Sequence, residues 1–185
     1  MTTTSEKLLT ADDLLELHSK GIRGELDRGV FCEIMSAGVE HGQIVMNLGG
    51  ELRNFIRPRR LGKLFGSDGG VLLERGPDTV REPDIGFISA EKSPLDERIV
   101  GYANVVPDLA VEIVSPSDSR QSVHERAQMW LNFGVRLVWV GFPEERTVDV
   151  YPEGGTMFTL REGDTLDGGE VLPGFSCAVS DVFDV

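Results

Sequence analysis

Apolar residues recur at helical spacing in three parts of the chain. The spacing predicts helices over residues 11–19, 39–56 and 119–133. Thr10 followed by Asp13 is typical of a capped helix start, and Gly134 suits the position just after a helix end. We expect Pro58 to stop the second helix, because proline lacks an N–H and clashes with the preceding turn.

Between and after these helices the pattern changes to short apolar runs bounded by Gly or Pro. These runs predict strands at residues 63–66, 71–74, 84–89, 109–114, 136–142, 147–151, 157–161 and 170–172. Residues 21–35 read as irregular chain with short strands, and residues 90–106 as a loop or broken helix over a site. The sum is one α/β domain (α+β) over residues 10–185, a sheet with the two longer helices packed on it, after a disordered or loosely held segment 1–9.

Composition excludes several classes of protein. The chain has 185 residues, 40% of them hydrophobic, and no apolar run of membrane-spanning length, so no membrane protein is expected. Its polar N-terminus lacks a signal region, and Cys32 and Cys177 lie too far apart for a metal-ligand spacing. We therefore expect two buried thiols in a reducing cytoplasm. A net charge of −13 also argues against an overall attraction to nucleic acid or an anionic membrane.

That charge is unevenly distributed. Residues 141–185 hold ten acidic and two basic residues, a net charge of −8. Residues 52–67 contain no acid and five bases, here called the basic strip: Arg53, Arg57, Arg59, Arg60 and Lys63. The strip is able to steer a phosphate backbone; the alternative is a solvated helix end and loop.

Two acids fall on predicted strands. Glu112 interrupts the run Leu-Ala-Val-Glu-Ile-Val, where a buried carboxylate has to be protonated, paired or bound to a cation; the alternative is an edge strand with Glu112 facing water. Asp84 begins another apolar strand after Pro83. Two such carboxylates at one point suit Mg²⁺, which takes oxygen ligands.

Two further residues are unusual on helical apolar stripes. Arg126 shares its stripe with Val123, Ala127, Trp130 and Phe133, so its head either reaches an acid or an anion or extends past the stripe to solvent. His41 lies on the stripe of the 39–56 helix, as a hydrogen-bonded core histidine or as a site residue.

The motif order resembles the Uma-two family of restriction-endonuclease-like proteins, within the PD-(D/E)XK nuclease superfamily. The resemblance rests on Glu25–Gly29, His41, Arg81–Asp84, Pro107–Pro116, Gly134-Val135, Trp139 and Leu172–Phe175. It extends from Thr10 to the C-terminus. It implies a restriction-endonuclease-like central mixed sheet flanked by helices, a C-terminal β meander and a metal-dependent phosphodiesterase-like site.

The resemblance also implies roles for single residues. Asp84 and Glu112 match the two metal-binding acids, the main-chain carbonyl of Ile113 is an added ligand, and Glu25 and His41 match positions near the site. The family's lysine, eight residues before the Gly-Val pair, is replaced by Arg126. Arginine cannot serve as a base, although it can hold a phosphate.

Three hypotheses follow. The first is a Mg²⁺- or Mn²⁺-dependent endonuclease acting on nucleic acid, with DNA expected rather than RNA. In it Arg126 contacts the scissile phosphate, the basic strip holds the backbone, and exposed Phe142 or Phe158 contributes to a homodimer. The second is a catalytically silent homologue, a binding or assembly module in which an Arg126–Glu112 ion pair replaces the metal. The third is a metal-free structural protein on the same fold.

Overall fold

A six-stranded mixed sheet forms the centre of the computed structural model, which describes residues 7–35, 38–116 and 118–185. The strands lie in the order β10-β9-β8-β7-β6-β3. They are β3 (Gly62–Gly66), β6 (Ile85–Ser89), β7 (Leu109–Ile113), β8 (Leu137–Phe142), β9 (Thr147–Pro152) and β10 (Phe158–Arg161). Neighbouring strands are antiparallel except β7 and β8, which are parallel because the helix α3 (Arg120–Asn132) carries the chain back between them. The predicted mixed sheet is confirmed.

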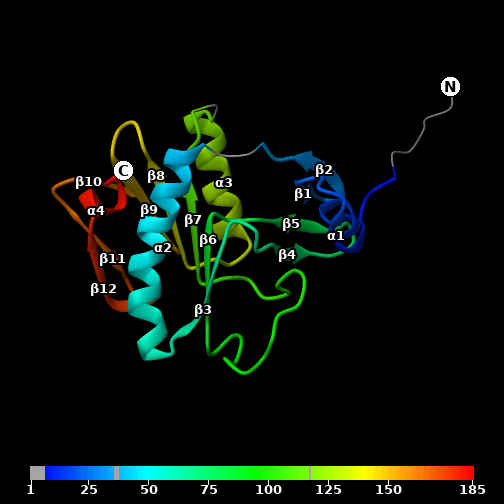
Figure 1. Ribbon diagram of the computed structural model, residues 1–185, viewed down its shortest axis with the longest axis horizontal. Coiled ribbons are helices and arrows are strands. Elements are labelled where there is room, and N and C mark those ends of the chain that lie inside the picture. The colour runs from blue at the N-terminus through cyan, green and yellow to red at the C-terminus, as the bar shows by residue number, and fades with distance from the viewer. Residues whose placement is uncertain (1–6, 36–37, 117) are drawn as a thin grey trace.

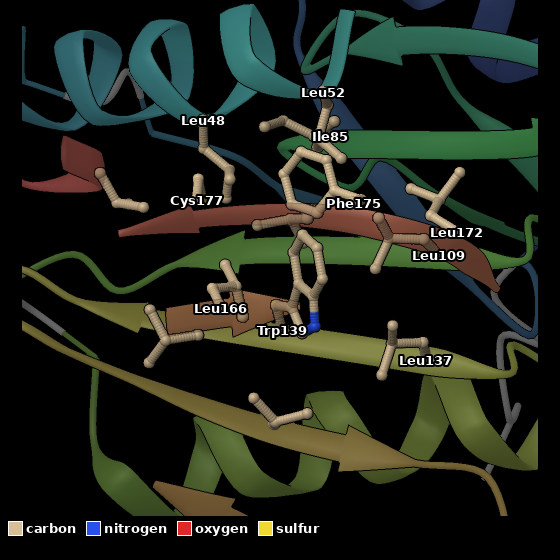
Figure 2. Packing of buried hydrophobic residues seen from close by; sticks show 14 of the residues in the cluster. Leu48, Leu52, Ile85, Leu109, Leu137, Trp139, Leu166, Leu172, Phe175 and Cys177 are labelled. Atoms are coloured by element: carbon tan, nitrogen blue, oxygen red, sulfur yellow. The ribbon is translucent and has the colours of Figure 1, made fainter. Parts of the chain in front are cut away.

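Helices α2 (Val39–Arg59) and α3 cover opposite faces of this sheet (Figure 1). Residues alternate along β7, so that Val111 packs in the α2 core and Ala110 in the α3 core. In the α2 core Trp139 stacks on Phe175 with ring centroids 5.8 Å apart, under Leu48 and Leu52 of the helix (Figure 2). The two apolar faces fix which way each side chain of β7 points.

A smaller sheet projects from one side of the central one (Figure 1). Its order is β2-β1-β5-β4, with β1 (Gly24–Asp27), β2 (Val30–Glu33), β4 (Val71–Glu74) and β5 (Thr79–Arg81). The helix α1 (Ala11–Ser19) packs on it, and the predicted capping box of Thr10 and Asp13 is present. Residues 1–6 of the segment expected to be loose lie outside the described residues, whereas the Leu9 N–H already donates to the Gly29 carbonyl at 2.8 Å.

The C-terminal part packs beside α2, at the side opposite the smaller sheet (Figure 1). After β9 and β10, which match predicted strands, the chain forms the pair β11 (Thr165–Gly168) and β12 (Leu172–Ala178) and the short helix α4 (Val179–Val182). The sequence pattern missed β11 and β5, and it placed the β12 strand too early. Among the described residues, none of the helices combines the length and hydrophobicity needed to cross a bilayer.

Three expectations from the sequence are wrong. Pro58 does not stop α2, which runs to Arg59, because in the last exposed turn the missing N–H removes a single helical bond. Cys32 is exposed on the edge strand β2, although Cys177 is buried as expected. Phe142 is buried in the α3 core, because β8 is covered on both faces. The expected loop over residues 90–106 leaves β6 at Ser89 and returns at Tyr102, whose hydroxyl lies 3.2 Å from Nδ1 of His18, a neighbour of Glu82.

Candidate active site

The strand register brings Asp84 and Glu112 together. Ile85 pairs with Val111 across the antiparallel strands β6 and β7, which places Asp84 and Glu112 side by side one residue further along. The Ile113 N–H donates a hydrogen bond to Asp84 Oδ2 at 2.7 Å, and this bond closes the end of the ladder. The two acids therefore lie next to each other where β6 begins and β7 ends, as the sequence pattern predicted.

His41 lies in the first turn of α2 and fixes Asp84 from the other side. Its Nε2 is 3.2 Å from Asp84 Oδ2 and 3.1 Å from the Ile113 carbonyl oxygen. Both neighbours are acceptors, so Nε2 carries the proton. The hydrogen bond to Asp84 is the main cause that raises the pKa of His41 above its usual value, while burial opposes it. His41 thus keeps a donor, and at lower pH a positive charge, against Asp84.

Glu112 points to the α3 side, where two donors meet one of its oxygens. The Trp130 Nε1–H donates to Glu112 Oε1 at 2.6 Å, and Arg126 Nε lies 2.9 Å from the same oxygen. Only 13% of the Glu112 side chain is exposed. Burial raises the pKa of Glu112 to about 7, and the positive charge of Arg126 limits that rise. The carboxylate therefore titrates near neutral pH.

Arg126 is held by acids rather than free to turn outward. Its two terminal nitrogens form a bidentate pair with Glu25, at 2.9 Å to Oε1 and 3.2 Å to Oε2, and Nη2 also reaches the Glu82 carbonyl at 3.4 Å. Burial alone would lower the pKa of Arg126, but the charges of Glu112 and Glu25 outweigh it and raise the pKa. The guanidinium is a fixed positive charge between two carboxylates.

Glu25 is a deeply buried acid of the site, with 3% of its side chain exposed. It lies on β1 of the smaller sheet and also accepts from Arg81 Nη1 at 3.1 Å and from the Glu82 N–H at 2.7 Å. The site thus joins both sheets through α3.

The sequence analysis gave no role to three residues of the site: Arg81, Glu82 and Trp130. The only signals available for them were the Arg-Glu-Pro-Asp motif and an aromatic residue one helical turn after Arg126.

Each of the two sheet-end acids keeps one oxygen without a protein partner among the residues that the structure describes. Asp84 uses Oδ2 and Glu112 uses Oε1, while Asp84 Oδ1 and Glu112 Oε2 make no hydrogen bond and are not buried. The described residues contain no group of three His, Cys, Asp or Glu side chains spaced to hold a metal. Two carboxylate oxygens and the Ile113 carbonyl nevertheless fit Mg²⁺, which commonly binds one or two carboxylates and fills the rest of its shell with water and phosphate oxygens.

The basic strip lies at the other end of α2. Arg59 follows His41 by 18 positions on this helix, a distance of about 27 Å. Lys63 is already used inside the protein, since its Nζ donates to Ser93 O at 2.9 Å, to Ser93 Oγ at 2.8 Å and to the Pro94 carbonyl. Arg59 lies over the Phe55 ring, 4.1 Å from its centroid. The structure therefore does not bring the strip to the acidic site.

Comparison with known proteins places this geometry among nuclease-like folds. The Uma2 (Uma-two) family model, described as “Putative restriction endonuclease”, matches residues 11–180. The crystal structure of “a putative nuclease belonging to DUF820” from Anabaena variabilis ATCC 29413 aligns with a TM-score of 0.80 and 20% sequence identity, over 95% of this chain and 97% of that chain. At this identity the likeness shows the shared fold. No curated protein matches the chain.

Proposed function

The chain belongs to the Uma2 family. From this membership we propose that it is a metal-dependent endonuclease that hydrolyses phosphodiester bonds in nucleic acid, with DNA rather than RNA as the expected substrate. One observation supports the proposal above all. Asp84 and Glu112 lie side by side, each fixed through one oxygen and open through the other. Two carboxylates that serve only to hold the fold together have no need of this arrangement.

Asp84 Oδ1, Glu112 Oε2 and the Ile113 carbonyl are the groups that would hold Mg²⁺ or Mn²⁺. When bound, the cation supplies polarisation of the phosphate and activation of the attacking water. Asp84 is oriented for this role by His41 and by the Ile113 N–H, both on Oδ2. A positive charge at the site also favours the ionised form of Glu112 over the protonated form that burial favours.

Arg126 takes a different role from the one expected from the sequence. Its contacts with Glu25, Glu112 and the Glu82 carbonyl occupy most of its donors, so it is poorly placed to reach a scissile phosphate. We assign it to keeping Glu112 ionised. It cannot act as the base, because arginine stays protonated at accessible pH.

A homodimer remains part of the proposal, since enzymes that cut both strands of a duplex often work as symmetric pairs. Phe142 is buried and cannot contribute to an interface, whereas Phe158 is 48% exposed on the edge strand β10. Light scattering on the purified chain, with Phe158→Ser as the variant, tests this point.

One observation favours a second candidate function, a silent module that binds without cleaving. The Arg126–Glu112 contact of 2.9 Å places a positive charge where a cation would otherwise neutralise Glu112. If this pair replaces the metal, Arg126→Lys leaves the protein without nuclease activity. A gain of Mn²⁺-dependent cleavage in Arg126→Lys would instead identify an active but weakened nuclease.

The decisive experiment combines metal titration with cleavage. We expect Mn²⁺ binding by calorimetry and cleavage of plasmid DNA by the wild type, and loss of both in Asp84→Asn. Asp96→Asn is the matched control, because Asp96 is exposed in the loop after β6 and makes no hydrogen bond or ion pair with the described residues. Absence of Mn²⁺ binding, or equal activity of the two variants, would refute the proposal.

A further inference from the structure

Trp130 makes a contact with the site that its place on an apolar helical stripe does not explain. It follows Arg126 by one turn of α3, so both side chains leave the helix on the same side. Its ring is fully buried in the α3 core, and its Nε1–H nevertheless donates to Glu112 Oε1 at 2.6 Å. An indole buried only for packing requires no carboxylate partner.

The second tryptophan of the chain shows the contrast. Trp139 is also fully buried, in the α2 core, and its Nε1 has no hydrogen-bond partner among the described residues. Burying an indole in this protein therefore does not by itself supply an acceptor for the N–H. The bond from Trp130 is specific to the side of the sheet that carries Glu112.

We propose that Trp130 is a positioning residue of the metal site: its indole N–H holds Glu112 Oε1, so that Oε2 is presented to the cation beside Asp84 Oδ1. This inference rests on the proposed function. Asp84 is held in the same way, because the Ile113 N–H and His41 fix Oδ2 and leave Oδ1 open.

The physical reason lies in the last torsion of a glutamate side chain. Rotation about this bond is broad and roughly two-fold, so an unrestrained carboxylate exchanges its two oxygens. A donor on one oxygen selects a single orientation before the cation arrives. Groups that orient a metal ligand in this way commonly change metal affinity by about 10- to 100-fold when they are removed.

The test compares Trp130→Phe with Trp139→Phe in the full chain. Both variants remove a fully buried indole, but only the first removes a hydrogen bond to Glu112. Calorimetric titration with Mn²⁺ alone is expected to show binding weakened about 10- to 100-fold in Trp130→Phe and close to wild type in Trp139→Phe. The ratio of the two affinities is the readout, because a loss of core packing affects both variants.

Equal affinities in the two variants would overturn the inference and leave the proposed function standing. No Mn²⁺ binding by the wild type would overturn both. If Trp130→Phe does not fold, ¹⁵N spectra of the wild-type indole N–H groups provide the second measurement, with the signals assigned in Trp139→Phe. The Trp130 signal should move on addition of Mg²⁺ while the Trp139 signal stays, and an unmoved Trp130 signal overturns the inference.

Discussion

Replacing Arg126 by methionine removes the guanidinium that contacts both Glu25 and Glu112, and its effect on stability follows from what each acid retains. Glu25 keeps Arg81 and the Glu82 N–H, whereas Glu112 keeps only the Trp130 N–H. Removing one partner of a buried ion pair costs about 3–5 kcal/mol. Because 35% of the Arg126 side chain is exposed, solvent screening reduces this to about 2–3 kcal/mol at pH 8.5.

The loss should depend on pH in a defined direction. The pKa of Glu112 is about 7 in the folded protein against 4.5 as its ordinary value, so the folded form holds the extra proton between these two values. Stability therefore falls as the pH rises through that window. Without Arg126 the folded pKa rises further and the fall continues to higher pH. Arg126→Met is thus expected to lose less stability at pH 6 than at pH 8.5.

Urea unfolding followed by tryptophan fluorescence at pH 6 and pH 8.5 measures this difference. With a slope of about 2 kcal/mol per M, the midpoint should fall by about 1 M at pH 8.5. Arg120→Met is the control on the same helix, since Arg120 pairs with Glu145 at the surface and should cost less than about 1 kcal/mol at either pH. A variant at position 126 that is as stable as the wild type at pH 8.5 would refute the assigned role of the ion pair.

Three further results are expected. In the native protein a thiol reagent should label Cys32 rapidly and Cys177 only after unfolding, because burial raises the pKa of Cys177 to about 12; two rapid thiols would contradict its packing. Replacing the four arginines of the basic strip by glutamine should reduce the magnitude of the slope of log affinity for DNA against log salt concentration by about 0.9 for each lost phosphate contact. Lys63→Gln should leave this slope unchanged, because Lys63 is bound inside the protein. A slope equal to that of the wild type in the arginine variant would show that the strip does not contact DNA. Below pH 7, Mn²⁺ affinity should rise by up to about tenfold for each unit by which the pH increases, because Glu112 must lose its proton. Glu112→Gln should weaken this dependence, and an unchanged dependence would exclude Glu112 as its source.

The central elements and the two acids could be predicted because local pattern determines them. An apolar strand interrupted by Glu112 and another that begins at Asp84 can bring the two acids to one point, and the antiparallel pairing of β6 with β7 does so. The arginine on an apolar helical stripe likewise had to reach an acid or leave the core. In these cases the cost of burying a charge is visible in the sequence itself.

Other features depend on contacts that no local pattern encodes. Trp130 matches an ordinary core residue, and only the packing of α3 on β7 aims its N–H at Glu112. Arg59 of the basic strip lies on the same helix as His41, yet the helix separates the two residues by about 27 Å. This distance corresponds to about eight base pairs of duplex at 3.4 Å each, so nucleic acid that contacts both must lie along α2.

Arginine at position 126 does what a lysine could not do in the same place. A planar guanidinium offers five donors, and here two nitrogens hold Glu25 while Nε lies against Glu112. An ammonium has no such fork and could serve one of these acids well, but not both. Arg126 therefore connects β1 of the smaller sheet to β7 of the central sheet and compensates two acids at once. Because it never releases its proton, hydrolysis under the proposed function would depend on the cation at Asp84 and Glu112 for the activation that a lysine would otherwise share.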